Sequence, residues 1–480
     1  MLLHSIAVRS AGRASFALLA SLAVLIVVAS AAPAQAGESV VYSFQGAPDS
    51  AAPIAGLVSD QHGALYGTTS SGGMGSSCAV YSGCGTVFML TPPDPGHTHW
   101  TRTVLYSFCS MSNCADGEGP LGGLILDREG ALYGTTAQGG NANNDGTVFK
   151  LTPPATGQTP WTESVLYSFQ GGTDGAHPYA GLIFDQQGAL YGTTQQGAEN
   201  STCSYGCGSV FKLTPPVAGG QSSWSESVIY SFCSLSGCTD GAYPASGLIF
   251  DREGALYGTN YSGGSVAHGT VFKLTPPAAG QSSWSESVLY SFCSRTNCPD
   301  GAYLYAGVIF DQHGALYGTT NSGGNSDSGT VFKLTPPTGG QTPWTESVLY
   351  SFCSQNSCSD GGFPQGGLIL DQEGALYGTT EQGGNANDGG TVFKLTPPAA
   401  GQTLWTETVL HSFCSQNNCT DGASPDAGLI AGVQGALYGT TYDGGSGSCS
   451  GYGCGTVFRQ CSAEVTEVFG GGVNSRCVHW

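Results

Sequence analysis

The sequence predicts an all-β protein: a seven-bladed β-propeller with four antiparallel strands per blade. A unit of about 60 residues is repeated seven times, and each unit contains four short runs rich in β-branched and aromatic residues. Gly, Pro, Asn, Asp or Ser bounds every run, and no window shows the apolar period of a helix. Four strands per repeat is the pattern of a propeller blade.

Composition limits the class of protein. The chain has 480 residues, of which 76 are Gly and only 10 % are charged, while 40 % are hydrophobic. This is too apolar for a disordered chain and too rich in Gly for a helical one. Lys and Arg number 13 against 33 Asp and Glu, for a net charge of −20, so we expect no nucleic-acid partner.

The N-terminus has the features of an export signal. Arg9 and Arg13 precede a short apolar run over 16–29, and Ala34-Gln35-Ala36 offers small residues for cleavage. A membrane anchor is the alternative, but a spanning helix needs about 20 apolar residues. We therefore expect residues 1–36 to be a signal peptide cleaved after Ala36. The mature protein is then secreted or periplasmic, with no membrane span.

Repeated words mark the blades. The unit over 285–344 reads S-E-S-V-L-Y-S-F, G-V-I-F-D, a Q-H-G turn, A-L-Y-G-T-T, G-T-V-F-K-L-T-P-P and a loop that ends in Trp. The D-Q-H-G and D-R-E-G words supply the residues of a tight hairpin, and Pro-Pro ends its strand. We expect the propeller over 37–460 and a tail or cap over 461–480. A β-solenoid has shorter coils, and separate four-stranded domains could not cover both their faces.

The order of strands within a blade is inferred by comparison with other propellers. The run of G-L-I-F-D, A-L-Y-G-T-T and G-T-V-F-K-L resembles an outer, inner and second strand. A-L-Y-G-T-T is therefore expected to line the channel, with E-S-V-L-Y-S-F third and G-L-I-F-D outermost in the next blade. Residues 40–44 are expected to complete the blade begun by 428–458 and so to close the ring by pairing the two ends of the chain. The run 465–469 is a rival closing strand.

Eighteen cysteines in an exported chain indicate disulfides. Most occur in short local pairs, and two units, at Phe44-Gln45 and Phe169-Gln170, lose both members of one pair together. Zinc is the alternative, but partner histidines are lacking. The expected pairs are Cys78–Cys84, Cys109–Cys114, Cys203–Cys207, Cys233–Cys238, Cys293–Cys298, Cys353–Cys358, Cys414–Cys419, Cys449–Cys454 and Cys461–Cys477. The eight local pairs should all lie on one face of the ring, which we take as the face for partners.

Other repeated polar residues have both a functional and a structural interpretation. A D-G pair precedes G-L-I-F-D in six units, with its Asp at Asp116, Asp174, Asp240, Asp300, Asp360 and Asp421. These carboxylates could form a ring for Ca²⁺ or a basic ligand. We favour the turn interpretation, in which each Asp accepts backbone N–H bonds, and we expect no cofactor. The lysines and tryptophans at fixed repeat positions are expected to pack between blades.

No catalytic constellation stands out, and the catalytic residues stay unknown. HExxH, GxSxG, Walker and dinucleotide motifs are absent from the sequence. Because the blades are near copies, any site should recur around the ring, which favours many weak binding sites. We therefore expect a secreted binding or scaffold protein for extracellular glycans or proteins. An extracellular polysaccharide hydrolase or lyase at the channel mouth, and a structural surface or matrix protein, are the alternatives. The oligomeric state is not predicted.

The units resemble the GloVer (Gloeo/Verruco) repeat family of exported bacterial proteins. The resemblance rests on the core G-A-L-Y-G-T-T…G-T-V-F-K-L, for example at 314–320 and 329–334, and covers the mature chain. It implies export but transfers no catalytic residue. Family members often carry a C-terminal sorting anchor, whereas 461–480 has neither an apolar tail nor a basic end cluster. This difference favours free secretion over attachment to the cell surface.

Overall fold

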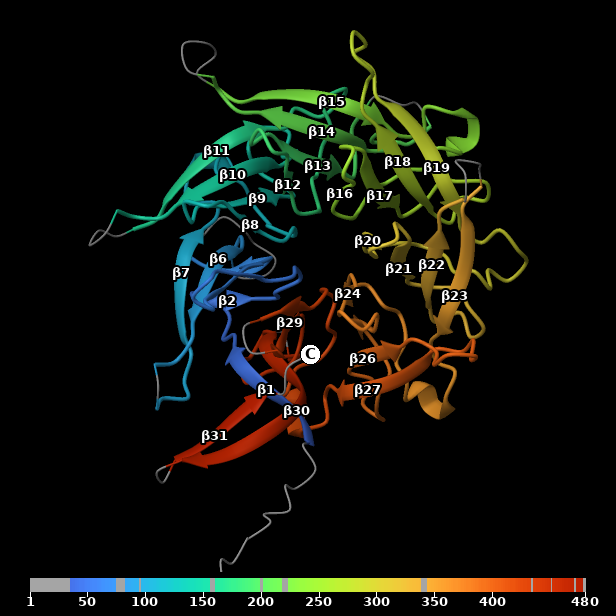
Figure 1. The fold of residues 1–480 in the computed structure, drawn as a ribbon. Coiled ribbons are helices and arrows are strands. Elements are labelled where there is room, and N and C mark those ends of the chain that lie inside the picture. Colours follow the sequence, from blue (N-terminus) through green and yellow to red (C-terminus); the bar gives the residue numbers. More distant parts are fainter. Residues whose placement is uncertain are drawn as a thin grey trace, which may run out of the picture. The chain divides into compact units, whose positions relative to one another are not determined.

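The computed structural model describes residues 35–74, 83–94, 96–155, 160–198, 202–217, 223–337, 343–432, 435–449, 451–469 and 472–477, with side chains described from 37 to 461. The chain divides into Met1–Ala34 and Gln35–Trp480, and only the second unit is described. Nearly the whole expected signal peptide thus lies outside the described residues. The second unit is a ring of seven antiparallel sheets, each with the four strands of a blade and the last one extended by a fifth strand, which confirms the predicted seven-bladed propeller (Figure 1).

In the first six blades the chain runs as a simple meander from the centre of the ring to its rim (Figure 1). The innermost strands are two residues long: β3 (Val58–Ser59), β8 (Ile125–Leu126), β12 (Ile183–Phe184), β16 (Ile249–Phe250), β20 (Ile309–Phe310), β24 (Ile369–Leu370) and β28 (Ile430–Ala431). The second strands carry L-Y-G-T: β4 (Leu65–Thr69), β9 (Leu132–Thr136), β13 (Leu190–Thr194), β17 (Leu256–Asn260), β21 (Leu316–Thr320), β25 (Leu376–Thr380) and β29 (Leu437–Thr441).

The outer half of each blade is longer. The third strands are β6 (Thr86–Thr91), β10 (Thr147–Thr152), β14 (Ser209–Thr214), β18 (Thr270–Thr275), β22 (Thr330–Thr335), β26 (Thr391–Thr396) and β30 (Thr456–Phe469). The rim strands are β7 (Thr101–Ser107), β11 (Thr162–Ser168), β15 (Ser225–Ser231), β19 (Ser285–Ser291), β23 (Thr345–Ser351), β27 (Thr406–Ser412) and β1 (Gln35–Ser43). We number the blades 1 to 7 from β3 to β28.

This order corrects the strand assignment made from sequence. G-L-I-F-D is the innermost strand of its own blade, A-L-Y-G-T-T is second, and E-S-V-L-Y-S-F lies at the rim. The tight turn between the first two explains why: the N–H of Asp251 donates to the carbonyl of Ala255, and Ile249 pairs with Tyr257. A turn this short forces neighbouring strands into one hairpin. An outermost G-L-I-F-D strand would have needed a connection across the whole blade.

The ends of the chain close the ring. β1 pairs antiparallel with β30 as the fourth strand of blade 7, so the first of the two closing strands considered above is the one used. The rival run instead pairs with β31 (Gly472–Cys477) as an extension of the same sheet. A threonine hydroxyl of each second strand donates to a backbone carbonyl of the next blade, and Thr440 makes this bond to Ala55 across the closure at 3.2 Å.

The apolar core lies between blades rather than within them. The Phe that follows each rim strand meets the Phe of the next blade's third strand edge-on or tilted, as Phe232 and Phe272 do with centroids 4.9 Å apart. Such pairs recur at all seven junctions. Seven repeats therefore bury seven similar wedges, and the ring is one packed body.

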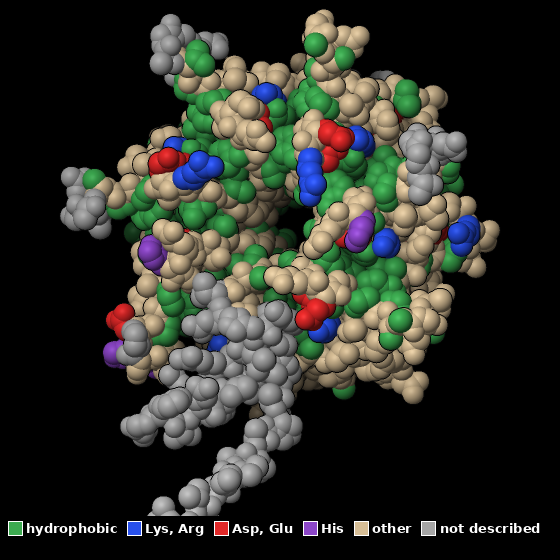
Figure 2. Space-filling view, viewed as in Figure 1, with side chains coloured by type: hydrophobic (Ala, Val, Ile, Leu, Met, Phe, Trp, Pro, Cys, Tyr) green, Lys and Arg blue, Asp and Glu red, His purple; other side chains and the backbone are tan. Residues whose placement is uncertain are grey.

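Loops leave the ring on two faces. Here "turn face" means the tight turns after the innermost strands and the Pro-Pro loops, and "disulfide face" means the loops after the second and rim strands. Figure 2 shows one side of the ring, with a hollow at its centre and with charged side chains in small groups of opposite sign. In the parts of the chain that the structure describes, no helix is long and apolar enough to cross a membrane.

Candidate functional site: the disulfide face

The disulfide face is built from two interlocked loops at each junction between blades. In blade 2 the N–H of Gly140, which follows the second strand, donates to the carbonyl of Cys114 in the loop from the preceding rim strand, at 2.9 Å. Glu118 and Gln138 join the same two loops by a short β-bridge. Loops tied in this way form a rigid platform, which is the usual setting for binding residues.

Disulfides hold many of these loops. The structure bonds Cys109–Cys114, Cys203–Cys207, Cys233–Cys238, Cys293–Cys298, Cys353–Cys358, Cys414–Cys419 and Cys449–Cys454. Cys84 and Cys461 are also disulfide-bonded. Cys78 lies outside the described residues, as does the side chain of Cys477. Four of the five C-x4-C loops turn through short 3₁₀ segments: η1 (Ser112–Cys114), η2 (Ser236–Cys238), η4 (Asn356–Cys358) and η5 (Asn417–Cys419).

The repeated D-G aspartates anchor these loops. Asp240 is fully buried and accepts hydrogen bonds from the hydroxyl of Tyr230 at 2.9 Å, from both the N–H and the hydroxyl of Ser234 at 2.8 Å, and from the N–H of Leu235 at 3.2 Å. Asp116 and Asp360 make the same set of bonds. These carboxylates point into their own loops, as the turn interpretation describes.

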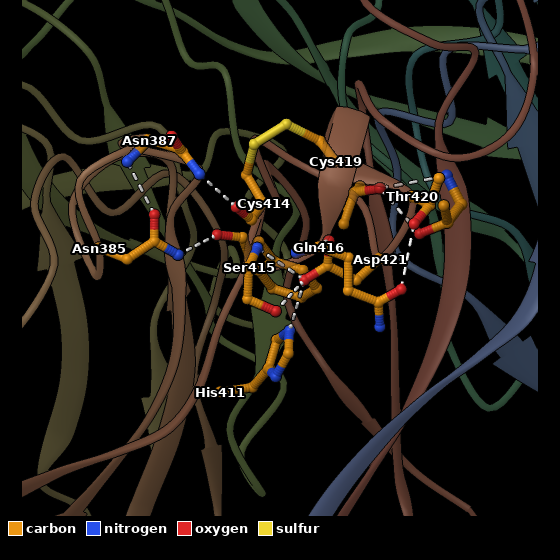
Figure 3. A network of polar contacts seen from close by, with 12 residues as sticks. Asn385, Asn387, His411, Cys414, Ser415, Gln416, Cys419, Thr420 and Asp421 are labelled. Carbon is orange, nitrogen blue, oxygen red and sulfur yellow. Dashed lines mark hydrogen bonds and ion pairs between the residues drawn. A yellow bond between two sulfur atoms is a disulfide. The ribbon is translucent and has the colours of Figure 1, made fainter.

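The other three carboxylates vary this arrangement. Asp300 keeps the Tyr290 and Ser294 bonds, whereas Asp174 stands in a shorter loop and accepts from Tyr167 and Gln170. Asp421 accepts from Ser415 and Gln416, with His411 in place of the tyrosine (Figure 3). Burial lowers the pKa of His411 and the nearby Asp421 opposes that shift.

Sequence reasoning missed a seventh member of this set. Asp49 accepts from the Tyr42 hydroxyl at 3.1 Å and from the N–H of Gln45 at 2.9 Å, and it forms an ion pair with Arg102 at 2.8 Å. Asp49 stands in a short loop and is followed by Ser50 in place of Gly, so the D-G motif is absent. The Tyr-Ser-Phe motif that precedes this loop was the sequence signal for Asp49.

Glutamates of the rim strands face these aspartates across six junctions. The Glu286 carboxylate lies near Asp240, and one of its buried oxygens has no hydrogen-bond donor among the described residues. Burial and the charge of Asp240 raise the pKa of Glu286 to about 7. The set comprises Glu38, Glu163, Glu226, Glu286, Glu346 and Glu407. At the seventh junction Arg102 takes this place and pairs with Asp49.

The lysines belong to a separate cluster near the turn face. Lys273 Nζ lies 3.5 Å from Asp251 Oδ2 and 5.1 Å from the centroid of the Tyr257 ring, and the Tyr257 hydroxyl donates to the same carboxylate. Blades 2, 3 and 5 repeat this cluster. Each of these four amines is thus paired with an aspartate of its own blade.

Two cavities open on the disulfide face. The larger, about 980 Å³, lies between blades 2 and 3 and is lined by Asp145, His177, Gln196 and Tyr205, among others. The second, about 650 Å³, lies between blades 6 and 7 beside the Cys414–Cys419 loop and Tyr452. Tyr205 is 78 % exposed and Tyr452 is 75 % exposed, so neither ring is used for internal packing. Exposed aromatic rings beside polar cavities are features of ligand sites.

Close to the innermost strands, the blades also differ from one another. Tyr261 stacks on Tyr303 with centroids 5.0 Å apart and lies 4.9 Å from Tyr305, in blades 4 and 5. In blades 6 and 7 the corresponding region carries Glu381 and Asp426. Burial, with the charges of Glu381 and Asp443, raises the pKa of Asp426 to about 7. The predicted equivalence of all blades therefore fails where the second and innermost strands meet the disulfide face.

The chain is similar to several proteins of known structure. It resembles PorZ, an essential bacterial surface component of the type-IX secretion system of Porphyromonas gingivalis, at 15 % identity and a TM-score of 0.47 over 87 % of this chain and 47 % of that one. This chain thus spans about half the length of that protein.

Two further structures are similar over nearly their whole length. A protein described as an oxidoreductase (glucose dehydrogenase) from Thermus thermophilus is 15 % identical, with a TM-score of 0.39 over 88 % of this chain and 99 % of that one. A luciferin-regenerating enzyme is 12 % identical, with a TM-score of 0.38 over 93 % of this chain and 100 % of that one.

No curated protein matches the sequence. A family model does match, as the Gloeobacter/Verrucomicrobia repeat, over residues 27–203 and 197–458. These two spans cover all seven blades. The chain therefore belongs to the Gloeobacter/Verrucomicrobia repeat family.

Proposed function

We propose that this protein is an exported binding module that recognises extracellular glycans or proteins through its disulfide face. The main support for the proposal is the pair of cavities on that face, each lined by a largely exposed tyrosine among other residues. The disulfides support an oxidising compartment outside the cytoplasm, because such bonds persist there and are rare inside. They also hold the loops in one geometry, which lowers the entropy lost on binding.

Binding is tested with the mature protein, residues 37–480, folded with its disulfides intact. A glycan array and capture of surface proteins are run in parallel with the variants Tyr205→Ser and Tyr452→Ser. Leu404→Ser is the control, because Leu404 is 80 % exposed but lies in a Pro-Pro loop of the turn face. We expect binding by the wild type and the control, with at least a tenfold loss when both tyrosines are replaced. No ligand in either screen, together with self-assembly in light scattering, would indicate a structural matrix protein instead.

Export is tested separately. The full chain is expressed in a bacterium, and the N-terminus of the exported protein is sequenced. We expect cleavage after Ala36. Retention of the intact chain in the membrane would support the anchor alternative.

A second candidate function is hydrolysis or elimination at a polysaccharide, favoured by the acids of blades 6 and 7. A carboxylic acid whose pKa lies near 7, such as Asp426, is suited to donate a proton, and Glu381 and Asp443 place further carboxyl groups near it. Release of reducing ends or of unsaturated products from a polysaccharide panel tests it. The activity should disappear in Asp426→Asn, whereas binding without product release supports the binding module.

A further inference from the structure

The cavity between blades 2 and 3 differs from the other junctions because its loop has been shortened. Asp174 follows Phe169 by five residues, whereas Asp116 follows Phe108 by eight residues. The shorter loop lacks the cysteine pair. At the junction of blades 6 and 7 the Cys414–Cys419 loop occupies the corresponding place (Figure 3). The loss of that loop leaves room for the larger of the two cavities.

A buried carboxylate lines this cavity without a partner among the described residues. Asp145 is only 9 % exposed, and its Oδ2 atom is buried with no hydrogen-bond donor from the described part of the chain. A Cβ atom added to Gly171 would lie 3.2 Å from both carboxylate oxygens, so glycine is what makes room for the charge. The other blades place Cys84, Cys207, His268, Ser328, Gly389 and Cys454 at this position. An unpaired buried carboxylate is costly, and a ligand that brings donors would relieve that cost.

His177 is fixed beside Asp145. Its backbone N–H donates to the Asp145 carbonyl at 2.8 Å, and its Nδ1 lies 2.8 Å from the Ala137 carbonyl. Because a carbonyl oxygen can only accept, Nδ1 donates, and Nε2 is the ring nitrogen left for a ligand. The corresponding residue is Tyr243, Tyr303 or Phe363 in blades 4 to 6, so the imidazole belongs to this junction.

The shortened loop also frees an amide. Asn143 corresponds to Asn387 in the nearly identical G-G-N-A-N loop of blade 6. Asn387 donates to the Cys414 carbonyl at 2.8 Å, and Asn385 donates to the Phe413 carbonyl at 2.6 Å (Figure 3). In blade 2 Asn141 keeps the bond to Phe169, but among the described residues Asn143 makes no bond to Gln170, which takes the place of Cys414, and it lines the cavity instead. Its amide is thus available to a ligand.

These groups define the chemistry of the ligand. A carboxylate and an imidazole nitrogen accept hydrogen bonds from hydroxyls, the amides of Asn143 and Gln196 both donate and accept, and the exposed Tyr205 ring offers a flat apolar face. None of the described residues that line the cavity is Lys or Arg, which disfavours an anionic ligand. The volume of about 980 Å³ is at the upper end of small-ligand pockets.

We infer that the cavity between blades 2 and 3 binds a neutral saccharide, with Asp145 and Asn143 bonded to its hydroxyls and Tyr205 stacked on a sugar ring. The inference rests on the proposed binding function and assigns a ligand class and residues to one site. Because only this junction combines the short loop with a carboxylate in the sequence, the site is single rather than repeated around the ring.

Calorimetry with cellohexaose, maltohexaose, xylohexaose and laminarihexaose tests it on the mature protein. We expect at least one of them to bind, with a loss of tenfold or more in Asp145→Asn and threefold or more in Asn143→Ala. The matched controls are Asp327→Asn and Ser326→Ala, which change the equivalent loop of blade 5 and should alter affinity less than twofold. Asn144 occupies the Asp327 position in blade 2, so that loop accepts Asn. Thermal melts verify that each variant is folded.

Two results would overturn the inference while sparing the proposed function. One is saccharide binding that survives both Asp145→Asn and Asn143→Ala, which places the ligand elsewhere on the ring. The other is binding of spermidine, but of none of the four saccharides, that Asp145→Asn abolishes, which makes this a site for cations. Failure of all probes together with a blank glycan and protein screen would refute the proposed function itself.

Discussion

Raising the pH from 5 to 8.5 should weaken the ring, because six rim-strand glutamates must then ionise beside buried aspartates. Glu286 carries the argument: its pKa is raised to about 7 by burial first and by Asp240 second, and one of its oxygens lacks a donor among the described residues. The Tyr230 hydroxyl, the other titratable group near it, donates to Asp240 rather than to Glu286. The unfolded chain exposes the same side chain at its ordinary pKa of 4.5.

The sign of the effect follows from linkage. A carboxyl whose pKa is higher in the folded state contributes its full stabilisation below pH 4.5 and loses it as the pH rises through about 7. One pKa unit corresponds to about 1.4 kcal/mol, so the shift of Glu286 from 4.5 to about 7 corresponds to about 3.5 kcal/mol before screening. Because the carboxylate is partly exposed, we discount this to about 1 kcal/mol. Six such groups should together cost the ring about 6 kcal/mol at pH 8.5.

Urea unfolding at pH 5 and pH 8.5 measures this cost in the wild type and in Glu286→Gln, which imitates the protonated acid. We expect the variant to match the wild type at pH 5 and to be more stable by about 1 kcal/mol at pH 8.5. Glu253→Gln is the control, since Glu253 is exposed in a tight turn. A wild type that is equally stable at both pH values would refute the reasoning. So would a gain in Glu286→Gln no larger than that of the control.

Three further changes test the packing, the loop anchors and the closure. Gly258→Ala should lower the free energy of unfolding by about 1–3 kcal/mol in urea at pH 6, since the new Cβ would lie 2.6 Å from the Phe272 ring; an unchanged midpoint would contradict this. Asp360→Ala should cost about 2–3 kcal/mol by the same measurement, because buried donors lose their acceptor, and the cost should persist with Cys353–Cys358 intact. Deleting residues 35–43 should expose the edge of β30 and give dimers or larger species in light scattering, whereas a monomer with an unchanged melt would speak against closure by pairing.

Sequence reasoning reached the number of blades and the closure because both follow from local patterns repeated seven times. The predicted strand order was wrong because it was taken from other propellers and not from the tight D-x-x-G turn in this sequence. The D-x-x-G turn had already been identified as a tight hairpin, and a tight hairpin makes its two strands neighbours. The sequence also does not explain why Gly recurs in every L-Y-G-T motif. It is required by packing: at Gly258 the Phe272 ring fills the space of a side chain, and the pattern recurs in each blade.

The candidate binding residues were harder to predict, since none belongs to a repeated motif. Asp145 stands out as a candidate binding residue only when the blades are aligned, because the other blades have Cys, Ser, His or Gly at its position. In the sequence, the missing cysteines after Phe169 indicate only that the cysteines pair locally. Their loss leaves a cavity because of the way the loops of blades 2 and 3 meet. The structure shows these loop contacts, whereas the sequence does not.

The repetition of the blades and the singularity of the proposed site have one physical explanation. Residues that close the ring, such as the inter-blade Phe pairs and the Thr hydroxyl bonds, must satisfy the same geometry at every junction and therefore recur. Apart from their repeated Asp anchors and disulfides, the loops of the disulfide face carry no such constraint, because the strands beneath them already fix the junction. Substitutions there, such as Asp145 in blade 2 or Asp426 in blade 7, leave the contacts that close the ring intact and are free to serve a ligand. In a ring of nearly identical blades, binding residues are therefore expected at the positions that differ between blades. The symmetry of the ring alone does not predict seven equal sites.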